Sequence, residues 1–378
     1  MLRTDSSPSV RLRAVLLIGF LGAGAAALVV LGNPGNMGLC GACFLRDLAG
    51  ALGFSTEGKG PAIFRPELAG LVLGATLLTL LRRRFVARSG SYAALRFALG
   101  IGMAILALVF LGCPFRLLQR LGGADLNAWF ALPGLLLGVR VAMRFEAQGY
   151  AIGTTAPAPA PVGLAGPIGI ALLLGLFLKD MLFGPGPEST GGPPHAPWAA
   201  ALSVSTAAGL VLSATGFCAV SAVRGAFNGR RAMTVAALVF VLGYGLTLFL
   251  AGKPNPGFLS PIAHSDHLWN FAAVFGLGLA GAMAGGCPIR QLVMTGEGNG
   301  DAFMTVSGLV VGGALAHNFG LVSRAAGPGG PGGPTASGRI AVVAAIVLLF
   351  LAAAWVTAAR RRAASTGESA QDRAKAIG

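Results

Sequence analysis

A five-residue motif that occurs twice decides the fold. Gly112–Arg116 reads Gly-Cys-Pro-Phe-Arg and Gly286–Arg290 reads Gly-Cys-Pro-Ile-Arg, and in each copy a glycine follows nine residues after the cysteine. A second pair precedes them, because Gly38–Arg46 (GLCGACFLR) matches Gly216–Arg224 (GFCAVSAVR). The two cysteine offsets, 287 − 113 = 174 and 218 − 40 = 178, are nearly equal. Two separate motifs at nearly one offset indicate an internal duplication of about half the chain.

The chain that carries this repeat is apolar throughout. Of its 378 residues, 54% are hydrophobic and 11% are charged, and the mean hydropathy is +0.74. A soluble domain carries about 25% charged residues, so the composition excludes a soluble enzyme, a secreted disulfide scaffold and a disordered protein. The 59 glycines and 22 prolines show no collagen period and are typical of membrane helices. The composition predicts an all-α polytopic membrane protein.

Ten apolar runs reach the roughly 20 residues that a helix needs to cross a bilayer. They lie at 14–32, 62–81, 92–112, 127–143, 163–183, 198–217, 232–251, 267–286, 302–322 and 339–358. The first run is long for a signal peptide and leads directly into a motif, so we expect an uncleaved span. The net charge of +15 comes largely from arginines at the ends of runs, which predicts orientation in a membrane rather than nucleic-acid binding.

These arginines divide unequally between alternate loops. If every run crosses once, one side receives Arg3, Arg11, Arg13, Arg82, Arg83, Arg84, Arg88, Arg96, Arg140, Arg144, Arg224, Arg230, Arg231, Arg360, Arg361 and Arg362. Cytoplasmic loops carry the excess of Lys and Arg, so we expect both termini in the cytoplasm. Five runs precede the second half of the chain, and this odd number predicts that the second half is inverted relative to the first.

We therefore expect four regions along the chain. They are a first transmembrane repeat over 1–146, a linker with an extra span over 147–197, a second repeat over 198–325, and a final span with a disordered cytoplasmic tail over 326–378. Each repeat holds two segments that are too short to cross a bilayer, at about 39–53, 114–122, 218–229 and 288–296. Interrupted helices in inverted repeats are typical of transporters, and they line the substrate path. The sequence predicts ten transmembrane helices and four short ones arranged as an hourglass.

The Cys-Pro-x-Arg motifs suit an anion with a sulfur end. Proline is favoured at the first position of a helix, which places each preceding cysteine at the cap, beside free backbone N–H groups. Arginine adds a permanent charge with forked donors, and a thiol is a soft, weakly hydrogen-bonding group. We expect the path of a sulfur-containing anion such as thiosulfate to be lined by Cys40, Cys113, Cys218, Cys287, Arg116 and Arg290.

Weaker candidates for the path are Cys43, Arg46, Arg224 and His317. A packing cysteine, a snorkelling arginine and a hydrogen-bonded core histidine are the alternatives for these residue types, and a proton relay is a further role for His317. Cys43 has Ser221 as its counterpart in the second half. Because Cys40-x-x-Cys43 also has a redox spacing, a membrane thiol-redox or sulfur-relay protein is the alternative function.

Other chemistries lack their residues in this sequence. It has no P-loop, Ser/His/Asp set or paired Cys-x-x-Cys zinc pattern, so we expect a protein that is not an enzyme and needs no metal or other cofactor. His264, Asp266 and His267 lie together at the entrance to a span, where capping is commoner than metal binding. Asp125 and Asp301 precede spans, and we expect each to cap one.

The run Gly32–Asp47 (GNPGNMGLCGACFLRD), together with the two Gly-Cys-Pro-x-Arg copies, resembles the YeeE/YedE family of sulfur-transport membrane proteins. Within that family it looks like the YedE type, which is described as a selenium-metabolism transporter. The resemblance covers roughly residues 14–325 and implies a bacterial inner-membrane importer of thiosulfate or of a related sulfur or selenium species. It implies that the anion passes along a chain of cysteines, which by motif match are Cys40, Cys113, Cys218 and Cys287.

The resemblance also implies a partner, a small cytoplasmic sulfurtransferase of the TusA type, which is not fused to this chain. Two features depart from the thiosulfate-transporting members of the family: the additional Cys43 and the final span at 339–358. Besides the anion and this partner, the protein is expected to contact membrane lipid.

Overall fold

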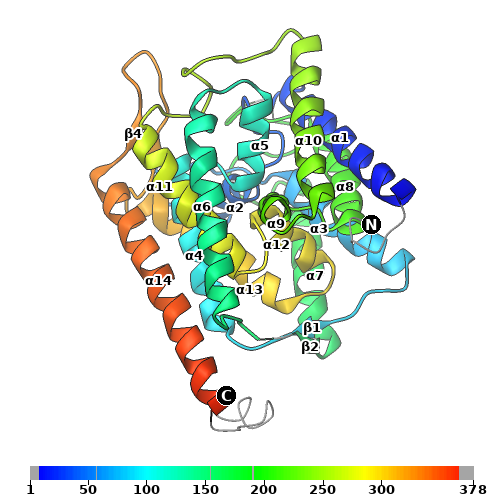
Figure 1. Cartoon of the computed structure of the whole chain (residues 1–378). Helices are drawn as coiled ribbons and strands as arrows, with labels where there is room; N and C mark the ends of the chain where they lie inside the picture. The colour runs from blue at the N-terminus through cyan, green and yellow to red at the C-terminus, as the bar shows by residue number, and fades with distance from the viewer. Residues whose placement is uncertain (1–7, 57, 154, 190, 366–378) are drawn as a thin grey trace.

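The computed structural model describes residues 8–56, 58–153, 155–189 and 191–365. Within them, ten long helices correspond one by one to the apolar runs (Figure 1): α1 (Pro8–Val30), α3 (Pro66–Leu81), α4 (Ala93–Phe110), α6 (Asn127–Ala147), α7 (Ala160–Leu178), α8 (Trp198–Thr215), α10 (Arg231–Leu250), α11 (His267–Met283), α13 (Gly300–Asn318) and α14 (Ala336–Ser365). Four short helices occupy the predicted non-spanning segments: α2 (Gly41–Ala51), α5 (Pro114–Gly122), α9 (Ala219–Phe227) and α12 (Pro288–Gly296). The all-α polytopic prediction is confirmed.

Eight of the described helical segments are long and apolar enough to cross a membrane, where the sequence pattern predicted ten. The two others are α3, which has only 16 residues between Pro66 and Arg82, and α13, which carries Asp301 and His317 near its ends. Three of the eight segments are 30 residues long because a short helix follows a long one almost directly, as α5 follows α4, α9 follows α8 and α12 follows α11.

Local sequence sets the break between each long helix and the short helix that follows it. Leu111 (φ 60°) caps the end of α4, Gly216 (φ 69°) caps the end of α8, and Gly285 (φ 86°) follows α11. A left-handed residue ends a helix because it turns the next N–H away from the hydrogen-bond ladder. Pro114 and Pro288 then begin α5 and α12, since their fixed φ and missing N–H suit the first helical position.

The long helices of one half of the chain pack against long helices of the other half. α1 packs on α10 and α3 on α8, while α4 packs on α13 and α6 on α11. Among the short helices, α2 contacts α13 and α9 contacts α6, whereas α5 contacts α10 and α12 contacts α3. If α1–α6 correspond to α8–α13, each contact maps onto its partner when the halves are exchanged. A two-fold relation between the halves would produce this pattern.

Two close approaches between helices repeat at the same offset as the motifs. A Cβ on Gly134 would lie 2.4 Å from the Phe271 carbonyl oxygen, and one on Gly308 would lie 2.1 Å from the Phe97 carbonyl oxygen. Both the glycines and the carbonyls are separated by 174 residues, since 308 − 134 = 174 and 271 − 97 = 174. Small residues allow membrane helices to approach each other closely, so glycine at these positions holds α6 against α11 and α13 against α4.

Loops gather on two faces of the molecule. On one face, β1 (Arg88–Ser89) pairs antiparallel with β2 (Ala156–Pro157), the Arg88 N–H donates to the Gly298 carbonyl (3.0 Å), and Arg361 at the end of α14 donates to the Gln148 carbonyl (3.0 Å). We call this the arginine-rich face, because it carries Arg82, Arg83, Arg84, Arg88 and Arg361. The β1–β2 ladder and the end of α14 lie at the bottom of Figure 1.

Other loops form the face on the far side of the molecule from the arginine-rich face, and we call it the opposite face. The Leu126 N–H donates to the Gly257 carbonyl (3.0 Å), and the Lys253 ammonium donates to the carbonyl of Val30 (3.0 Å). Part of the Pro/Gly-rich segment 325–337, expected to be a flexible connector, is hydrogen-bonded here, since β3 (Ser323–Arg324) pairs antiparallel with β4 (Gly333–Pro334). Alternate loops therefore lie on alternate faces, as a chain that crosses repeatedly requires.

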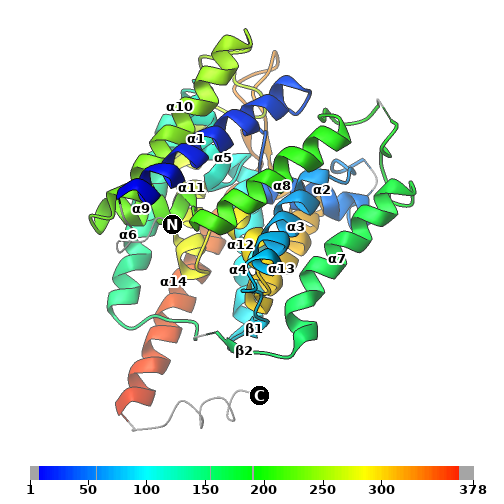
Figure 2. The same ribbon diagram turned by 90° about the vertical axis from the view of Figure 1, so that its right-hand side faces the viewer.

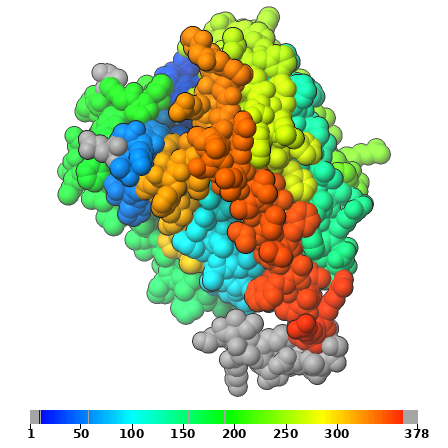
Figure 3. Space-filling model, turned by 90° about the vertical axis from the view of Figure 1, so that its left-hand side faces the viewer, coloured from blue at the N-terminus to red at the C-terminus, as the bar shows by residue number. Residues whose placement is uncertain are grey.

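Two long helices lie outside this exchange of partners. Figure 2 shows α7 at one edge of the molecule beside α3 and α13, and Figure 3 shows α14 running along the surface next to α4. In both helices only 28% of the apolar window is buried inside the protein. The tail predicted to be disordered after Arg362 remains helical to Ser365, and residues 366–378 lie outside the described part of the chain.

Candidate functional site

The four repeat-matched cysteines are the N-cap residues of the four short helices. Cys40 caps α2, Cys113 caps α5, Cys218 caps α9 and Cys287 caps α12, and all four are buried with extended backbone. The first turn of a helix has N–H groups without intrahelical partners, and they carry the positive end of its dipole. Each of these thiols therefore lies beside backbone donors that attract negative charge.

The four caps form two pairs that meet at the centre of the molecule. The thiols of Cys40 and Cys113 interact with each other, and the Cys287 N–H donates to the Cys218 sulfur (3.3 Å). The pairs adjoin because α2 abuts α12: a Cβ on Gly41 would lie 2.9 Å from the Ile289 nitrogen. Glycine directly after Cys40 therefore permits the contact between the first half and the second.

Cys43 lies one position inside α2 rather than at a cap. Its sulfur is 2.7 Å from the Cys40 sulfur, and its backbone N–H donates to that same sulfur (3.4 Å). Ser221 occupies the matching position in α9. The first half therefore presents a group of three thiols, Cys40, Cys43 and Cys113, whereas the second half presents two.

The first motif arginine, Arg116, is held by backbone carbonyls. Its guanidinium is fully buried and donates to the carbonyls of Asn36 (2.8 Å), Gly35 (3.1 Å), Pro261 (3.4 Å) and Leu111. Among the described residues, no carboxylate forms an ion pair with Arg116. It ties the break after α4 to the loops of the opposite face, and its charge is balanced only by carbonyl dipoles.

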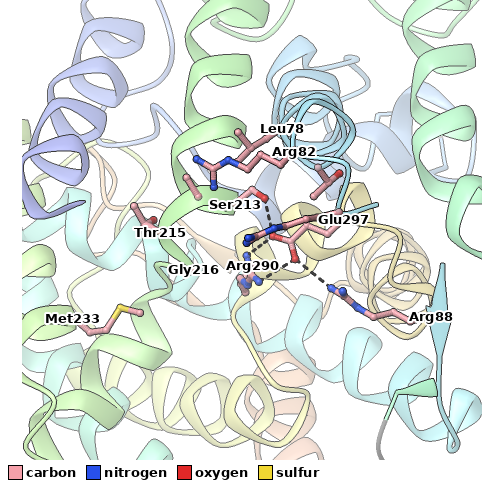
Figure 4. Close-up of a pocket in the computed structure, with 12 residues that line it drawn as sticks. Leu78, Arg82, Arg88, Ser213, Thr215, Gly216, Met233, Arg290 and Glu297 are labelled. Carbon is pink, nitrogen blue, oxygen red and sulfur yellow. Dashed lines mark hydrogen bonds and ion pairs between the residues drawn. The ribbon is translucent and has the colours of Figure 1, made fainter. Parts of the chain in front are cut away.

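The second motif arginine, Arg290, has a carboxylate partner. Its two terminal nitrogens lie 3.0 and 3.1 Å from the two oxygens of Glu297, so the pair is bidentate. Glu297 also accepts hydrogen bonds from Arg88 (3.3 Å) and from the Ser213 hydroxyl (2.9 Å), as Figure 4 shows. The two arginines look alike in sequence, yet one is bound by carbonyls and the other is neutralised.

Arg290 and Glu297 line a cavity of about 980 Å³ that adjoins the arginine-rich face. The end of α3, the loop after it, the end of α8, the start of α10 and α12 supply its walls (Figure 4). The other lining residues are Leu78, Thr79, Arg82, Arg84, Arg88, Ser213, Ala214, Thr215, Gly216 and Met233. Sequence reasoning assigned no role to Glu297 and used the loop arginines only for orientation, because their meeting point depends on the packing of α3, α8 and α12.

Two of the weaker candidates, Arg46 and Arg224, are held in ion pairs. Arg46 and Arg65 both bind Asp47, with nitrogen–oxygen distances of 2.6 and 2.9 Å. Arg224 forms a bidentate pair with Glu146 (2.6 and 2.5 Å) and donates to the Ala282 carbonyl. These pairs brace short helices against their neighbours and leave neither arginine free to bind substrate.

His317 lies in the last turn of α13, at the end of that helix nearer to the opposite face. Its Nδ1 is 2.7 Å from the Lys59 carbonyl oxygen, and its Nε2 has no hydrogen-bond partner among the described residues. It is only partly buried, unlike the four cysteines at the helix caps.

One of the two expected capping aspartates differs from the prediction. Asn299, not Asp301, caps α13 by accepting from the Ala302 N–H (3.2 Å), while Asp301 pairs with Arg96 (3.1 Å). Asp125 accepts from the Asn127 N–H (3.0 Å) at the start of α6, and its other oxygen binds the buried Arg120 at 2.5 Å. The prediction was wrong for Asp301 because the turn at Gly298 (φ 84°) places Asn299 at the cap.

The comparison with protein-family models agrees with the motif pattern. Residues 214–377 match a family model described as sulphur transport, and the match includes Cys218 and the second Cys-Pro-x-Arg motif. A comparison with curated proteins found no match. The matched region is the half of the chain that repeats the motifs of the first half, so the resemblance seen in the sequence is confirmed. Over this region the chain is similar to the YeeE/YedE sulphur-transport family, and the eight apolar helical segments fit a multi-pass membrane protein.

Proposed function

We propose that this protein imports a sulfur-containing anion, thiosulfate or a related sulfur or selenium species, across the bacterial inner membrane. The path runs between the two halves and is lined by Cys40, Cys113, Cys218 and Cys287. The observation that carries this proposal is that these four buried thiols are the N-caps of four short helices whose N-termini meet at the centre.

The chemistry of the junction fits a thiosulfate-like ion. Its oxyanion end takes the free N–H groups of the first helical turns, which are charge-assisted donors. Its terminal sulfur takes the weak S–H donors of the cysteines, which bind soft atoms without holding them tightly. The ion moves from the Cys40–Cys113 pair to the Cys218–Cys287 pair, and no cofactor takes part.

Both termini lie in the cytoplasm in this proposal, so the arginine-rich face is cytoplasmic. The arginines of the short loops support this orientation, because positive charge is retained on the cytoplasmic side during insertion. The anion enters from the opposite face, near Arg116, and leaves through the cavity that Arg290 lines. A TusA-like sulfurtransferase accepts it at the cytoplasmic face.

Growth of a sulfur-auxotrophic host on thiosulfate as sole sulfur source, with and without this gene, tests the function. Cys113→Ala and Cys287→Ala are expected to abolish growth while the protein still inserts into the membrane. Cys43→Ser is the matched control, because the second half already has serine at that position. Normal transport by both alanine variants would show that these cysteines only pack, and the thiol path would be wrong.

The alternative function, a membrane thiol-redox or sulfur-relay protein, is favoured by one observation. The sulfurs of Cys40 and Cys43 are in direct contact at 2.7 Å. Mass spectrometry of the native protein during uptake separates the two functions. A Cys40–Cys43 disulfide or a persulfide that forms and disappears with turnover would support the relay, whereas thiols that stay unmodified support transport of the intact anion.

A further inference from the structure

We infer that the cavity on the arginine-rich face is a second anion site, and that Glu297 is its built-in competing ligand. In the structure the Glu297 carboxylate is paired with the Arg290 guanidinium, and a transported oxyanion must compete with this carboxylate for Arg290 before it is released. This inference rests on the proposed function and adds to it a release site and the residue that tunes the affinity of that site.

The charges around the cavity favour anions. Four arginines line it against one glutamate, and they come from α12 and from the loop that follows α3: Arg82, Arg84, Arg88 and Arg290. A cavity with walls of one sign concentrates ions of the opposite sign. The hydroxyls of Thr79, Ser213 and Thr215 add hydrogen-bond groups, so the lining suits an oxyanion.

Glu297 is bound as such an oxyanion would be bound. Both of its oxygens take guanidinium donors of Arg290, and they receive further donors from Arg88 and from the Ser213 hydroxyl. Bidentate arginine contacts of this kind recognise carboxylates and other planar or tetrahedral oxyanions alike. The protein therefore places its own carboxylate where a sulfur oxyanion has the same partners.

The other half of the chain lacks this carboxylate. The position that matches Glu297 is Gly123, because 297 − 123 = 174, the offset of the two Cys-Pro-x-Arg motifs. A Cβ on Gly123 would lie 1.9 Å from the side-chain oxygen of Asn36, so no larger residue fits. Arg116, the counterpart of Arg290, accordingly has no carboxylate partner among the described residues.

This difference gives the path a direction. At the opposite face the unneutralised charge of Arg116 attracts an incoming anion, while at the arginine-rich face Glu297 lowers the affinity for the same anion. Weak binding at the exit allows the ion to leave, which a path of uniformly strong sites would prevent. The side chain of Glu297 can be displaced because it caps the end of α12, directly before Gly298 with φ 84°.

The test is titration of the purified full-length protein with sulfate and with thiosulfate by calorimetry. Glu297→Gln keeps the shape of the side chain but removes the negative charge that competes with the anion. Because hydrogen bonds to charged groups are stronger than those to neutral ones, we expect sulfate to bind about tenfold more tightly to this variant. Glu297→Asp retains the charge and should restore the wild-type affinity. In uptake assays Glu297→Gln should lower the half-saturating concentration of thiosulfate and also lower the maximal rate.

Glu146→Gln is the matched control. It breaks a bidentate pair of the same kind, with Arg224, outside the cavity, so sulfate affinity should not change. If Glu297→Gln does not fold, Glu297→Ser is titrated in its place, because it also removes the competing charge and is expected to shift the sulfate affinity in the same direction. A sulfate affinity of the folded Glu297 variant equal to that of Glu146→Gln would overturn the inference and leave the transport proposal intact. A wild-type protein that binds sulfate here but does not take up thiosulfate would refute only the transport proposal.

Discussion

Gly41→Ala tests whether the junction between the two halves is the transport path. Gly41 follows Cys40 at the start of α2, and the added methyl group would lie 2.9 Å from both the Ile289 nitrogen and the Pro288 carbonyl carbon. Those atoms belong to the backbone at the start of α12, so no side-chain rotation relieves the contact.

The size of the perturbation follows from these distances. Ordinary contact begins near 3.4 Å, so α2 and α12 must separate by 3.4 − 2.9 = 0.5 Å. Overpacking of this kind costs about 1–3 kcal/mol of stability. The protein should therefore still fold, with a lowered melting temperature, but the Cys40–Cys113 pair moves away from the Cys218–Cys287 pair. We expect thiosulfate uptake to fall by about tenfold or more, as misplacement on this scale does at other binding centres.

The assay measures initial uptake of labelled thiosulfate into vesicles, alongside thermal unfolding in detergent followed by tryptophan fluorescence. Gly102→Ala is the control, because Gly102 lies within α4 and a Cβ there has no atom within 4 Å. Alanine at that position should leave both uptake and unfolding unchanged or slightly raise stability. Equal uptake by Gly41→Ala and Gly102→Ala would refute the placement of the path at the α2–α12 junction.

Two other predictions concern a buried ion pair and the topology. Arg120→Met leaves the Asp125 carboxylate buried without the partner that lies 2.5 Å away, so it should lower the free energy of unfolding by about 3–5 kcal/mol. The double variant Arg120→Met with Asp125→Asn should recover part of that loss in the same denaturation assay. Gly192→Cys, in a background without native cysteines, should react with an impermeant maleimide added outside cells, while Arg84→Cys should react only after the membrane is opened. The opposite labelling would mean a reversed orientation, and labelling of both from one side would mean a wrong number of crossings.

Much of the local structure follows from the sequence because its causes are local. Hydropathy marks the long helices, and a proline at the first helical position places the starts of α5 and α12 at Pro114 and Pro288. The duplication was readable from two motif pairs, and the glycine contacts at Gly134 and Gly308 repeat at the same offset. Cysteine at the caps was also predictable for Cys113 and Cys287, since the residue before an N1 proline is the cap.

Two of the ten predicted crossing helices, α3 and α13, were harder to predict because they are buried by tertiary packing. α3 and α13 occupy two of the predicted runs, but α3 has only 16 residues and α13 falls short in hydropathy. α3 is buried at its start by polar as well as apolar contacts, including Glu67, whose carboxylate accepts from Asn33 at 2.7 Å. Helices that pack inside the protein need less hydropathy than helices that face lipid, so criteria of length and hydropathy miss these two, although the apolar runs at 62–81 and 302–322 marked both.

Only the tertiary structure decided how the charged residues are used. The sequence presents Arg116 and Arg290 as equivalent copies, but their partners are loop carbonyls in one case and Glu297 in the other. The difference arises because Asn36 fills the space beside Gly123, whereas the space beside Arg290 is open to a cavity. The motifs alone therefore determined the repeat, the helix starts and the cysteine caps, because these depend on neighbouring residues. The pairing of charges and the cavity depend on contacts between segments far apart in the chain, which only the packed helices bring together.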